Sequence, residues 1–135
     1  MNFKIKQTTD FDLIKQLNDE IFPEDKLHLD EKTVAWVVTD EEGRYAAFCT
    51  ARRLIHGILY MDRGGVIPKF RKQGLHRKLI SVRERYAKRN GYKKVITYVM
   101  KDNYASLFTL IRCDYKMYTP EYKYAGDNVI YLIKE

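Results

Sequence analysis

The apolar residues near the N-terminus follow two different periods. Residues 3–7 alternate between apolar and polar side chains, which predicts a short strand. Apolar residues then recur at helical spacing and stop before Pro23: Phe11, Ile14, Leu17 and Ile21. Thr9 or Asp10 can cap this helix, because their side-chain oxygens accept hydrogen bonds from the free amides of a first turn. The chain is therefore expected to begin with a strand and a helix, followed by a charged loop or short helix over residues 24–32.

Three segments that read as strands come next, with turn signals between them, and the first of the three is apolar and β-branched. They cover residues 34–39, 44–54 and 58–66. The turn signals are Asp40-Glu41-Glu42-Gly43 and His56-Gly57. Short connections of this kind join neighbouring antiparallel strands, so the pattern predicts a three-stranded meander.

The second half of the chain alternates between helical and strand patterns. Residues 74–89 carry one apolar helical stripe, formed by Leu75, Leu79, Val82 and Tyr86. The basic residues of this helix are expected on its other faces: Arg77, Lys78, Arg83, Arg85, Lys88 and Arg89. Asn90-Gly91 predicts the helix end, and residues 95–100 read as a strand buried on both faces. Asn103 can cap another helix before two closing strands at 115–118 and 128–133, so the order predicts a mixed α/β fold.

Composition narrows the class of protein. A chain of 135 residues is the size of one domain, so residues 1–135 are expected to form a single unit. No apolar run is long enough for a membrane span, and the N-terminus lacks the apolar core of a signal peptide. Cys49 and Cys113 lie far apart with no metal-ligand spacing, which argues against a disulfide scaffold or a zinc finger and favours the cytoplasm. The formal net charge of +7 suggests an anionic ligand.

The segment with the clearest chemistry is residues 66–79, where a strand ends, a basic loop turns at Gly74 and a helix begins. The first turn of a helix presents unpaired amides and the positive end of the helix dipole, which together can bind phosphate groups. Five cationic side chains surround this turn: Lys69, Arg71, Lys72, Arg77 and Lys78. From the residues alone, an anion site and a plain strand–helix connection with a solvated basic face both remain open.

The same segment resembles the acetyl-CoA-binding signature of the GNAT superfamily of N-acetyltransferases. The matching residues are Val66-x-Pro68-x-x-Arg71-x-Gln73-Gly74-Leu75 and Leu79. Downstream, Gly91-Tyr92-Lys93-Lys94-Val95 and Asn103-x-x-Ser106 match the helix end and the start of the following helix. The resemblance implies a GNAT-like fold, with a mostly antiparallel central sheet, a splayed parallel strand pair and flanking helices.

The resemblance also implies transfer of an acetyl group from acetyl-CoA to a primary amine, by direct attack of the neutral amine and without a metal. Backbone groups of Val66 and Ile67 would meet the pantetheine arm. The pyrophosphate would meet a set of residues in the turn: Arg71, Lys72, Gln73, Gly74, Leu75 and His76. Asn103 and Ser106 would approach the thioester region. His76 stands where the family has a small residue, and Leu110 falls where many members carry a tyrosine that protonates the leaving thiolate.

The catalytic residues implied by position are Asp62, as the general base, and Tyr98, which helps to position a water. If the strand alternates regularly, Asp62 shares a face with Tyr60 and Gly64. A structural ion pair of Asp62 with Arg52, Arg53 or Arg63 is the alternative. Tyr104, Tyr115 or Tyr118 could replace the missing acid, although packing or surface roles explain them as well.

Two other classes of function remain open: a GNAT-like module that binds CoA or a partner with little catalysis, and a basic nucleic-acid-binding domain. The aromatic residues are spread through strands rather than gathered in one basic patch, which argues against nucleic acid. The acceptor, an amine-bearing small molecule or protein, is expected between the first helix, the 24–32 loop and residues 115–128. Whether the chain forms a homodimer is also open, and no membrane partner is expected.

Overall fold

The computed structural model describes residues 2–135, and it contains each expected helix and strand in the expected order. The strands are β1 (Lys4–Thr8), β2 (Thr33–Thr39), β3 (Tyr45–Arg53), β4 (Ile58–Val66), β5 (Lys94–Met100), β6 (Lys116–Tyr118) and β7 (Val129–Lys134). The helices are α1 (Phe11–Ile21), α2 (Leu75–Arg89) and α3 (Tyr104–Arg112), with a short 3₁₀ turn at Pro68–Phe70. Asp10 and Asn103 cap α1 and α3 as expected, each accepting a bond from a first-turn amide.

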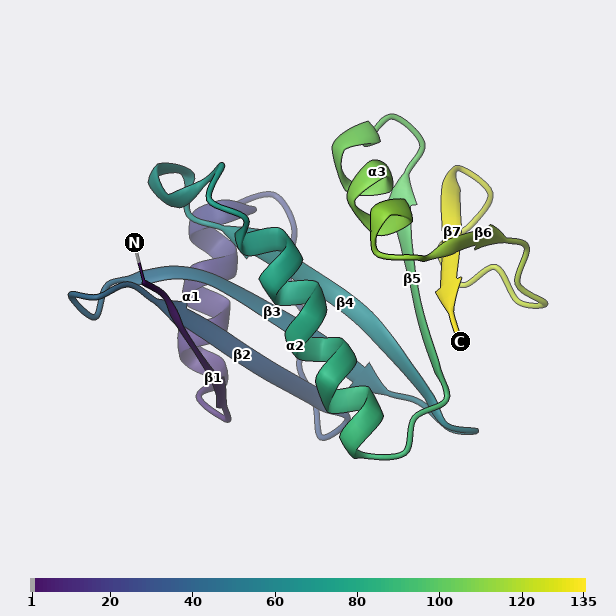
Figure 1. Ribbon diagram of the computed structural model, residues 1–135, viewed down its shortest axis with the longest axis horizontal. Coiled ribbons are helices and arrows are strands. Elements are labelled where there is room, and N and C mark those ends of the chain that lie inside the picture. The colour runs from purple at the N-terminus through teal and green to yellow at the C-terminus, as the bar shows by residue number, and fades with distance from the viewer. Residues whose placement is uncertain (1) are drawn as a thin grey trace.

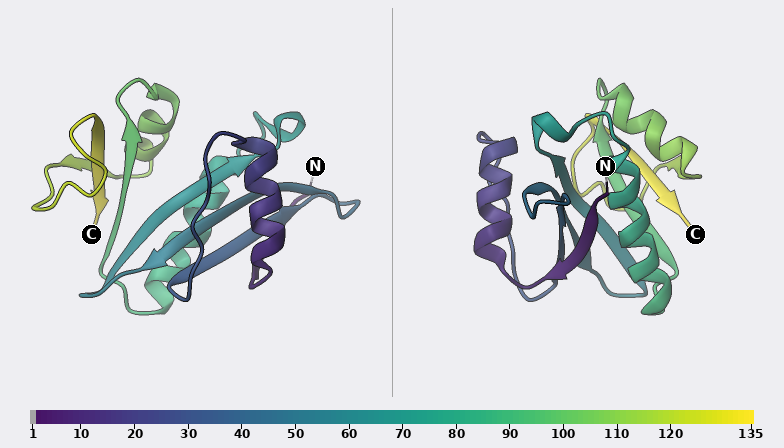
Figure 2. Two further views of the ribbon diagram at one scale, coloured as in Figure 1. Left: turned by 180° about the vertical axis from the view of Figure 1, so that it is seen from behind. Right: turned by 60° about the vertical axis from the view of Figure 1, so that its left-hand side comes forward.

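The strands form one seven-stranded sheet in the order β1-β2-β3-β4-β5-β7-β6. All neighbours pair antiparallel except β4 and β5, which run parallel (Figure 1). Helix α1 covers one face of the sheet, and α2 and α3 cover the other (Figure 2). The predicted fold class, a mostly antiparallel sheet with one parallel pair and flanking helices, is confirmed.

The core lies on both sides of the central strands. Phe48 of β3 and Leu59 of β4 are fully buried, as are Ile14 of α1 and Leu79 of α2. At roughly 25 cal/mol per Å² of apolar surface removed from water, packing of this kind holds the helices against the sheet. Strands β3 and β4 are thereby packed on both faces, so they rigidly support the residues and loops at their ends.

Strands β4 and β5 separate part of the way along their length. Their pairing ends at Tyr60 and Ile96, whereas β4 continues to pair with β3 as far as Val66. The edge of β4 beyond Tyr60 is therefore free of strand pairing on the β5 side. Figure 1 shows the two strands opening into a V, with α3 beside the open end. The expected splayed pair is confirmed.

A β-bulge interrupts β4 just beyond this point. Cys49 pairs with Gly64 and Ala51 pairs with Met61, so the single residue Thr50 faces two residues of β4. A bulge breaks the two-residue alternation of side chains. A side chain at Gly64 would meet Leu79 and Arg83 on the α2 face, whereas one at Gly65 would meet Phe22 on the α1 face. The expectation that Asp62 and Gly64 share a face is therefore wrong, because the bulge lies between them.

The adjacent glycines of β4 are expected to differ in their tolerance of a side chain. A Cβ atom at Gly65 would lie 2.7 Å from Phe22 and 3.1 Å from both Ile21 and Phe48. Overpacking of this kind costs about 1–3 kcal/mol, so Gly65→Ala should lower the melting temperature measurably. Gly64→Ala is the matched control, because its Cβ would be no closer than 3.4 Å to any neighbour. Equal melting temperatures for the two variants would show that α1 does not pack closely on β4.

No helix within residues 2–135 combines the length and the apolar character that a membrane span requires.

Candidate active site

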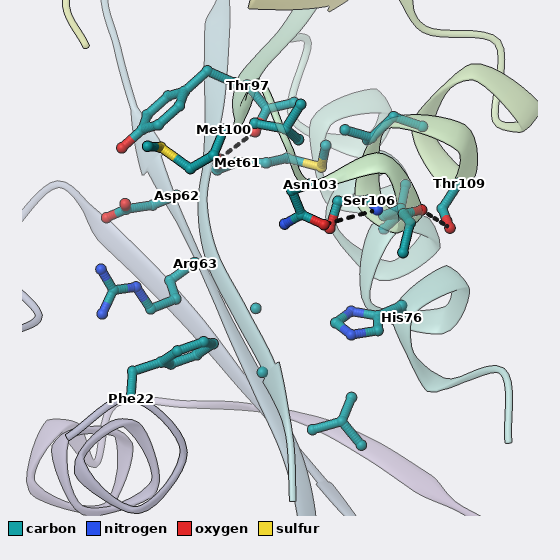
Figure 3. Close-up of a pocket in the computed structure, with 18 of the residues that line it drawn as sticks. Phe22, Met61, Asp62, Arg63, His76, Thr97, Met100, Asn103, Ser106 and Thr109 are labelled. Atoms are coloured by element: carbon teal, nitrogen blue, oxygen red, sulfur yellow. Dashed lines mark hydrogen bonds between the residues drawn. The ribbon is translucent and has the colours of Figure 1, made fainter. Parts of the chain in front are cut away.

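A cavity of about 700 Å³ lies where β4 and β5 separate, and it opens between the two sides of the sheet. Figure 3 shows Phe22, Asp62 and Arg63 on one side of the β4 ribbon. His76, Asn103, Ser106 and Thr109 lie on the other side. A cavity that connects the two faces can bring together two substrates that enter from opposite sides. We call it the β4–β5 cavity.

Asp62 lines the β4–β5 cavity and is one of the two β4 residues that face Thr50 in the bulge. Its carboxylate takes part in none of the ion pairs found among residues 2–135, so the structural alternative of an ion pair with Arg52, Arg53 or Arg63 finds no support. Burial raises the pKa of Asp62 above its ordinary value, and the charges of Arg63, Arg52 and Arg83 only partly oppose this. A carboxylate with a raised pKa accepts a proton more readily, as a general base must.

Arg63 fixes the end of helix α1 against β4. Its Nη1 donates to Oδ1 of Asn18 at 2.9 Å and to the backbone oxygen of Asp25 at 3.1 Å. Its guanidinium also lies over the ring of Phe22, 5.2 Å from the centroid. Asn18 is fully buried and donates to the same Asp25 oxygen at 2.7 Å. The helical pattern gave no sign of this network, because it joins residues far apart in the sequence.

Of the three segments expected to surround the acceptor, only the end of α1 borders the β4–β5 cavity. Ile21 and Phe22, at the end of α1, line the β4–β5 cavity. No lining residue comes from the 24–32 loop or from residues 115–128. The loop acid Asp30 instead pairs with Arg52, with Nη2 and Oδ2 2.9 Å apart.

Tyr98 lines the cavity from β5 and belongs to a group of packed tyrosines. Its ring stacks on that of Tyr60 with centroids 6.4 Å apart, and it meets Tyr124 edge-on at 5.9 Å. Burial, followed by the charge of Asp62, raises the pKa of Tyr60. Tyr98 is the member of this cluster that lines the cavity, so an aromatic ring borders the same space as the Asp62 carboxylate.

The first turn of α2 and the loop before it border the other side of the cavity. Gly74 starts the helix in a left-handed conformation, φ +77°, and no side chain caps the helix amides. Lys72, also at positive φ, and Gln73 are exposed, whereas the side chain of Leu75 is buried in the core. The first-turn amides therefore remain available to an anion.

Arg71 and His76 are the residues of this turn that line the cavity. Although His76 is exposed as a whole, partial desolvation of its ring lowers its pKa, and the charges of Arg83 and Arg71 lower it further. The imidazole is therefore neutral at neutral pH, and the positive charge at this end of the cavity comes from the guanidiniums. Lys72, Gln73, Gly74 and Leu75 do not line the cavity, so any contact they make with a ligand lies outside it or runs through their backbone.

The free edge of β4 presents backbone groups to the gap. The Ile67 amide donates to the Ala46 oxygen on β3 at 2.8 Å. Because successive strand residues direct their backbone groups to opposite edges, Val66 and Gly64 direct theirs toward β5. The Val66 oxygen accepts from Nε of Arg71 at 3.3 Å, and Val66 lines the cavity. The geometry therefore supports the expected role of Val66 and gives no support to one for the Ile67 amide.

The start of α3 forms the remaining wall. Asn103 and Ser106 line the cavity, and Oδ1 of Asn103 accepts from the Ser106 amide at 3.3 Å. Leu110 also lines it and is buried, so no phenol is available at that position. Tyr104, Tyr115 and Tyr118 do not line it. Tyr115 donates instead to Glu84 at 2.9 Å, so its hydroxyl is engaged away from the cavity.

The position of Arg83 differs from the one predicted by the sequence. Arg83 was expected on an outer face of α2, yet its exposed fraction is 6% and it lines the cavity. The helical pattern offers one signal in retrospect: residue 83 is eight positions after Leu75, on the side that faces the core. A basic residue on a core-facing position is unusual, because burying a charge is costly unless it is compensated.

Neither of two further kinds of catalytic group, a metal cluster or a reactive cysteine, is found at the cavity in the described part of the chain. Among residues 2–135, no group of three or more His, Cys, Asp or Glu side chains is arranged to hold a metal ion. Neither cysteine lines the cavity. Burial raises the pKa of the Cys49 thiol to about 11, so it stays protonated and is a poor nucleophile at neutral pH.

Comparison with known proteins identifies the family of the chain. The model of the acetyltransferase (GNAT) family matches residues 3–115 of the 135 in the chain. The chain therefore belongs to the GNAT acetyltransferase family, as the resemblance of residues 66–79 indicated. Membership makes it an acyltransferase of a family that uses acetyl-CoA and acts on amines. No match was found among curated protein sequences.

Several solved structures share the fold. The ribosomal-protein-S18-alanine N-acetyltransferase from Escherichia coli aligns with a TM-score of 0.77 at 16% identity, over 98% of this chain and 91% of that one. The spermidine/spermine N-acetyltransferase SpeG from Vibrio cholerae gives 0.75 at 15% identity, over 98% and 94%. A candidate streptothricin acetyltransferase from Bacillus anthracis, in complex with acetyl coenzyme A, gives 0.73 at 12%, over 98% and 96%. At these identities the similarity establishes the fold alone.

Proposed function

We propose that the protein is an N-acetyltransferase that moves an acetyl group from acetyl-CoA to a primary amine, by direct attack within a ternary complex. The observation that carries this proposal is the β4–β5 cavity. It joins an uncapped helix terminus and a free strand edge on one side to an unpaired carboxylate on the other. These features can bind the pyrophosphate and the pantetheine arm of a CoA thioester and can deprotonate an amine beside the thioester.

The residues around the cavity fit acetyl-CoA. The amides at the start of α2 and the guanidinium of Arg71 bind the pyrophosphate, since both favour negative charge. The free backbone edge at Val66 and Gly64 hydrogen-bonds the pantetheine amides in the manner of an added strand. Asn103 and Ser106 lie at the far wall, close to the thioester.

Acetyl-CoA supplies a carbonyl carbon that the amine nitrogen attacks, and the C–S bond breaks as the N–C bond forms. Asp62 takes the proton of the acceptor ammonium, directly or through a water positioned by Tyr98. With Leu110 in the expected place of a tyrosine, the leaving group departs as a thiolate, which a thiol pKa of about 8.5 permits. The thiolate then takes up the second proton, which the nitrogen loses as the amide forms. Because no cysteine lines the cavity, direct transfer is favoured over a route through an acylated thiol.

The acceptor in this reaction is an amine-bearing small molecule or protein. The cytoplasm is the proposed location, because the free thiols Cys49 and Cys113 fit a reducing compartment. A GNAT-like module that binds CoA without catalysis is the second candidate, and Leu110 is the observation that favours it.

The first test is the melting temperature with and without acetyl-CoA, at low and at high salt. At about 100 times the dissociation constant, a ligand adds roughly 2.7 kcal/mol to the free energy of unfolding, or roughly 10 °C at this size. A shift that survives moderate salt is the expected result, and an amine screen with detection of released thiol follows. No shift contradicts the cofactor assignment, and a shift with no turnover on any amine favours the non-catalytic module.

A further inference from the structure

Arg83 carries a buried charge that the described chain does not neutralise. Its exposed fraction is 6%, and none of the ion pairs among residues 2–135 includes it. Its hydrogen bonds go to two neutral backbone oxygens. Nε donates to Leu79 at 3.0 Å, and Nη1 donates to Thr50 at 3.3 Å. A buried guanidinium is stabilised far better by an anion than by carbonyl groups alone.

The guanidinium of Arg83 lies inside the cavity rather than at the phosphate end. The bond to Leu79 holds it about 6 Å along the helix axis from Leu75, because each residue of a helix advances by about 1.5 Å. Its Nη2 would lie only 3.4 Å from a Cβ atom at Gly64. Gly64 sits between Val66 and Asp62, on the part of β4 that borders the acyl end of the donor in the proposed binding mode.

The side chains that line the cavity carry more positive than negative charge, and Asp62, which feels the charge of Arg83, forms no ion pair with it. Arg63, Arg71 and Arg83 face one carboxylate, Asp62. Arg63 is held by Asn18, the Asp25 oxygen and the ring of Phe22, and Arg71 is assigned to the pyrophosphate. The acetyl group itself carries no charge. The glycine at position 64 keeps the space before Nη2 open, so a small anion can reach it from the cavity.

We propose that the β4–β5 cavity also binds a thioester of CoA whose short acyl chain ends in a carboxylate, as in a four-carbon dicarboxylic acid, and that Arg83 binds this carboxylate. The inference rests on the proposed function, since it uses the same thioester site and the same base. In the transfer, Asp62 takes the ammonium proton, the neutral amine nitrogen bonds to the thioester carbonyl carbon and the C–S bond breaks. CoA leaves as the thiolate and takes up the second proton, which the nitrogen loses as the amide forms. The terminal carboxylate does not react and stays bound to Arg83.

Binding of unreactive thioethers tests the inference without knowledge of the acceptor. S-ethyl-CoA stands for the acetyl donor, S-carboxypropyl-CoA for the dicarboxylic donor and S-butyl-CoA for a chain of equal length without charge. The wild-type protein should bind S-carboxypropyl-CoA about 10- to 100-fold more tightly than S-butyl-CoA, the gain expected of one charge-assisted contact. Equal or weaker binding of the charged thioether overturns the inference while leaving the proposed function intact. Failure to bind even S-ethyl-CoA overturns the proposed function itself.

Variants then locate the contact. Arg83→Met should reduce the affinity ratio of S-carboxypropyl-CoA to S-butyl-CoA to about one or below. Arg71→Met should weaken both thioethers together and keep the ratio, because the phosphates are common to both. Arg85→Met is the matched control, since Arg85 is an exposed arginine of the same helix, and its ratio should equal that of the wild type. An unchanged ratio in Arg83→Met overturns the inference and leaves Arg83 as a brace for Thr50 at the bulge. If Arg83→Met does not fold, the wild-type comparison decides alone.

Discussion

Asp62→Asn should lower kcat by about 10²- to 10⁴-fold, the usual contribution of a positioned general base. Asparagine keeps the size of the side chain and removes its ability to take a proton. Because the pKa of Asp62 is raised by burial, wild-type activity should rise with pH through that raised value. The variant should lose this limb and retain the limb set by the acceptor ammonium. The pH profile of kcat/KM, measured for both proteins once an acceptor is found, distinguishes the limb set by Asp62 from the limb set by the acceptor ammonium.

The same substitution should make the protein more stable at neutral pH. A carboxyl whose pKa is higher in the folded than in the unfolded state contributes stability below its unfolded pKa of about 3.9, and this contribution is lost as the pH rises through the folded value. Above that window the buried ionised group of Asp62 opposes folding. The Tm of Asp62→Asn should therefore exceed that of the wild type at neutral pH, and the difference should vanish near pH 3.

Activity lost together with stability gained is the signature of a residue kept for function. Asp19→Asn is the matched control, because Asp19 is an exposed carboxylate on α1 and does not line the β4–β5 cavity. It should leave both kcat and the pH profile unchanged. If Asp62→Asn instead lowers Tm and leaves the pH profile intact, Asp62 is a structural residue and another group accepts the proton.

Gly74→Glu should weaken acetyl-CoA binding at least 100-fold. The residue begins α2 at φ +77°, next to the amides assigned to the pyrophosphate, and a glutamate there places negative charge where the ligand is also negative. A Cβ atom at Gly74 meets nothing within 4 Å, so the fold itself tolerates the side chain. At a concentration that adds roughly 2.7 kcal/mol to the wild type, a 100-fold loss leaves about 0.4 kcal/mol. Thermal shift and titration calorimetry both measure this difference.

Gly74→Asn controls for backbone strain, since asparagine adopts the left-handed conformation more readily than other residues and carries no charge. Its affinity for acetyl-CoA should fall by less than about 10-fold, and its Tm without ligand should match that of Gly74→Glu within a few degrees. If Gly74→Glu and the wild type bind acetyl-CoA with equal affinity, the pyrophosphate does not bind at the start of α2.

The sequence was sufficient to predict the helices and strands of this protein. Helical spacing placed α1 and α2, alternation and turn residues placed the meander, and the side chains of Asp10 and Asn103 marked two helix starts. These features depend on residues a few positions apart, whose preferences act before any tertiary contact forms. The family signature around Gly74 belongs to the same class, because it describes one continuous turn between a strand and a helix.

The tertiary structure decided what depends on distant residues. The bulge opposite Thr50 turned Gly64 toward α2 and separated it from the face of Asp62, which strand alternation alone could not foresee. The tertiary structure also buries Arg83 against β3 and β4, although the charge of this residue and the basic residues around it in the sequence predicted a solvent-exposed position. Bulges and buried charges arise where packing and hydrogen bonds across the sheet outweigh local preference. The sequence by itself determined the elements and the family, whereas only the fold set which side chains meet in the cavity.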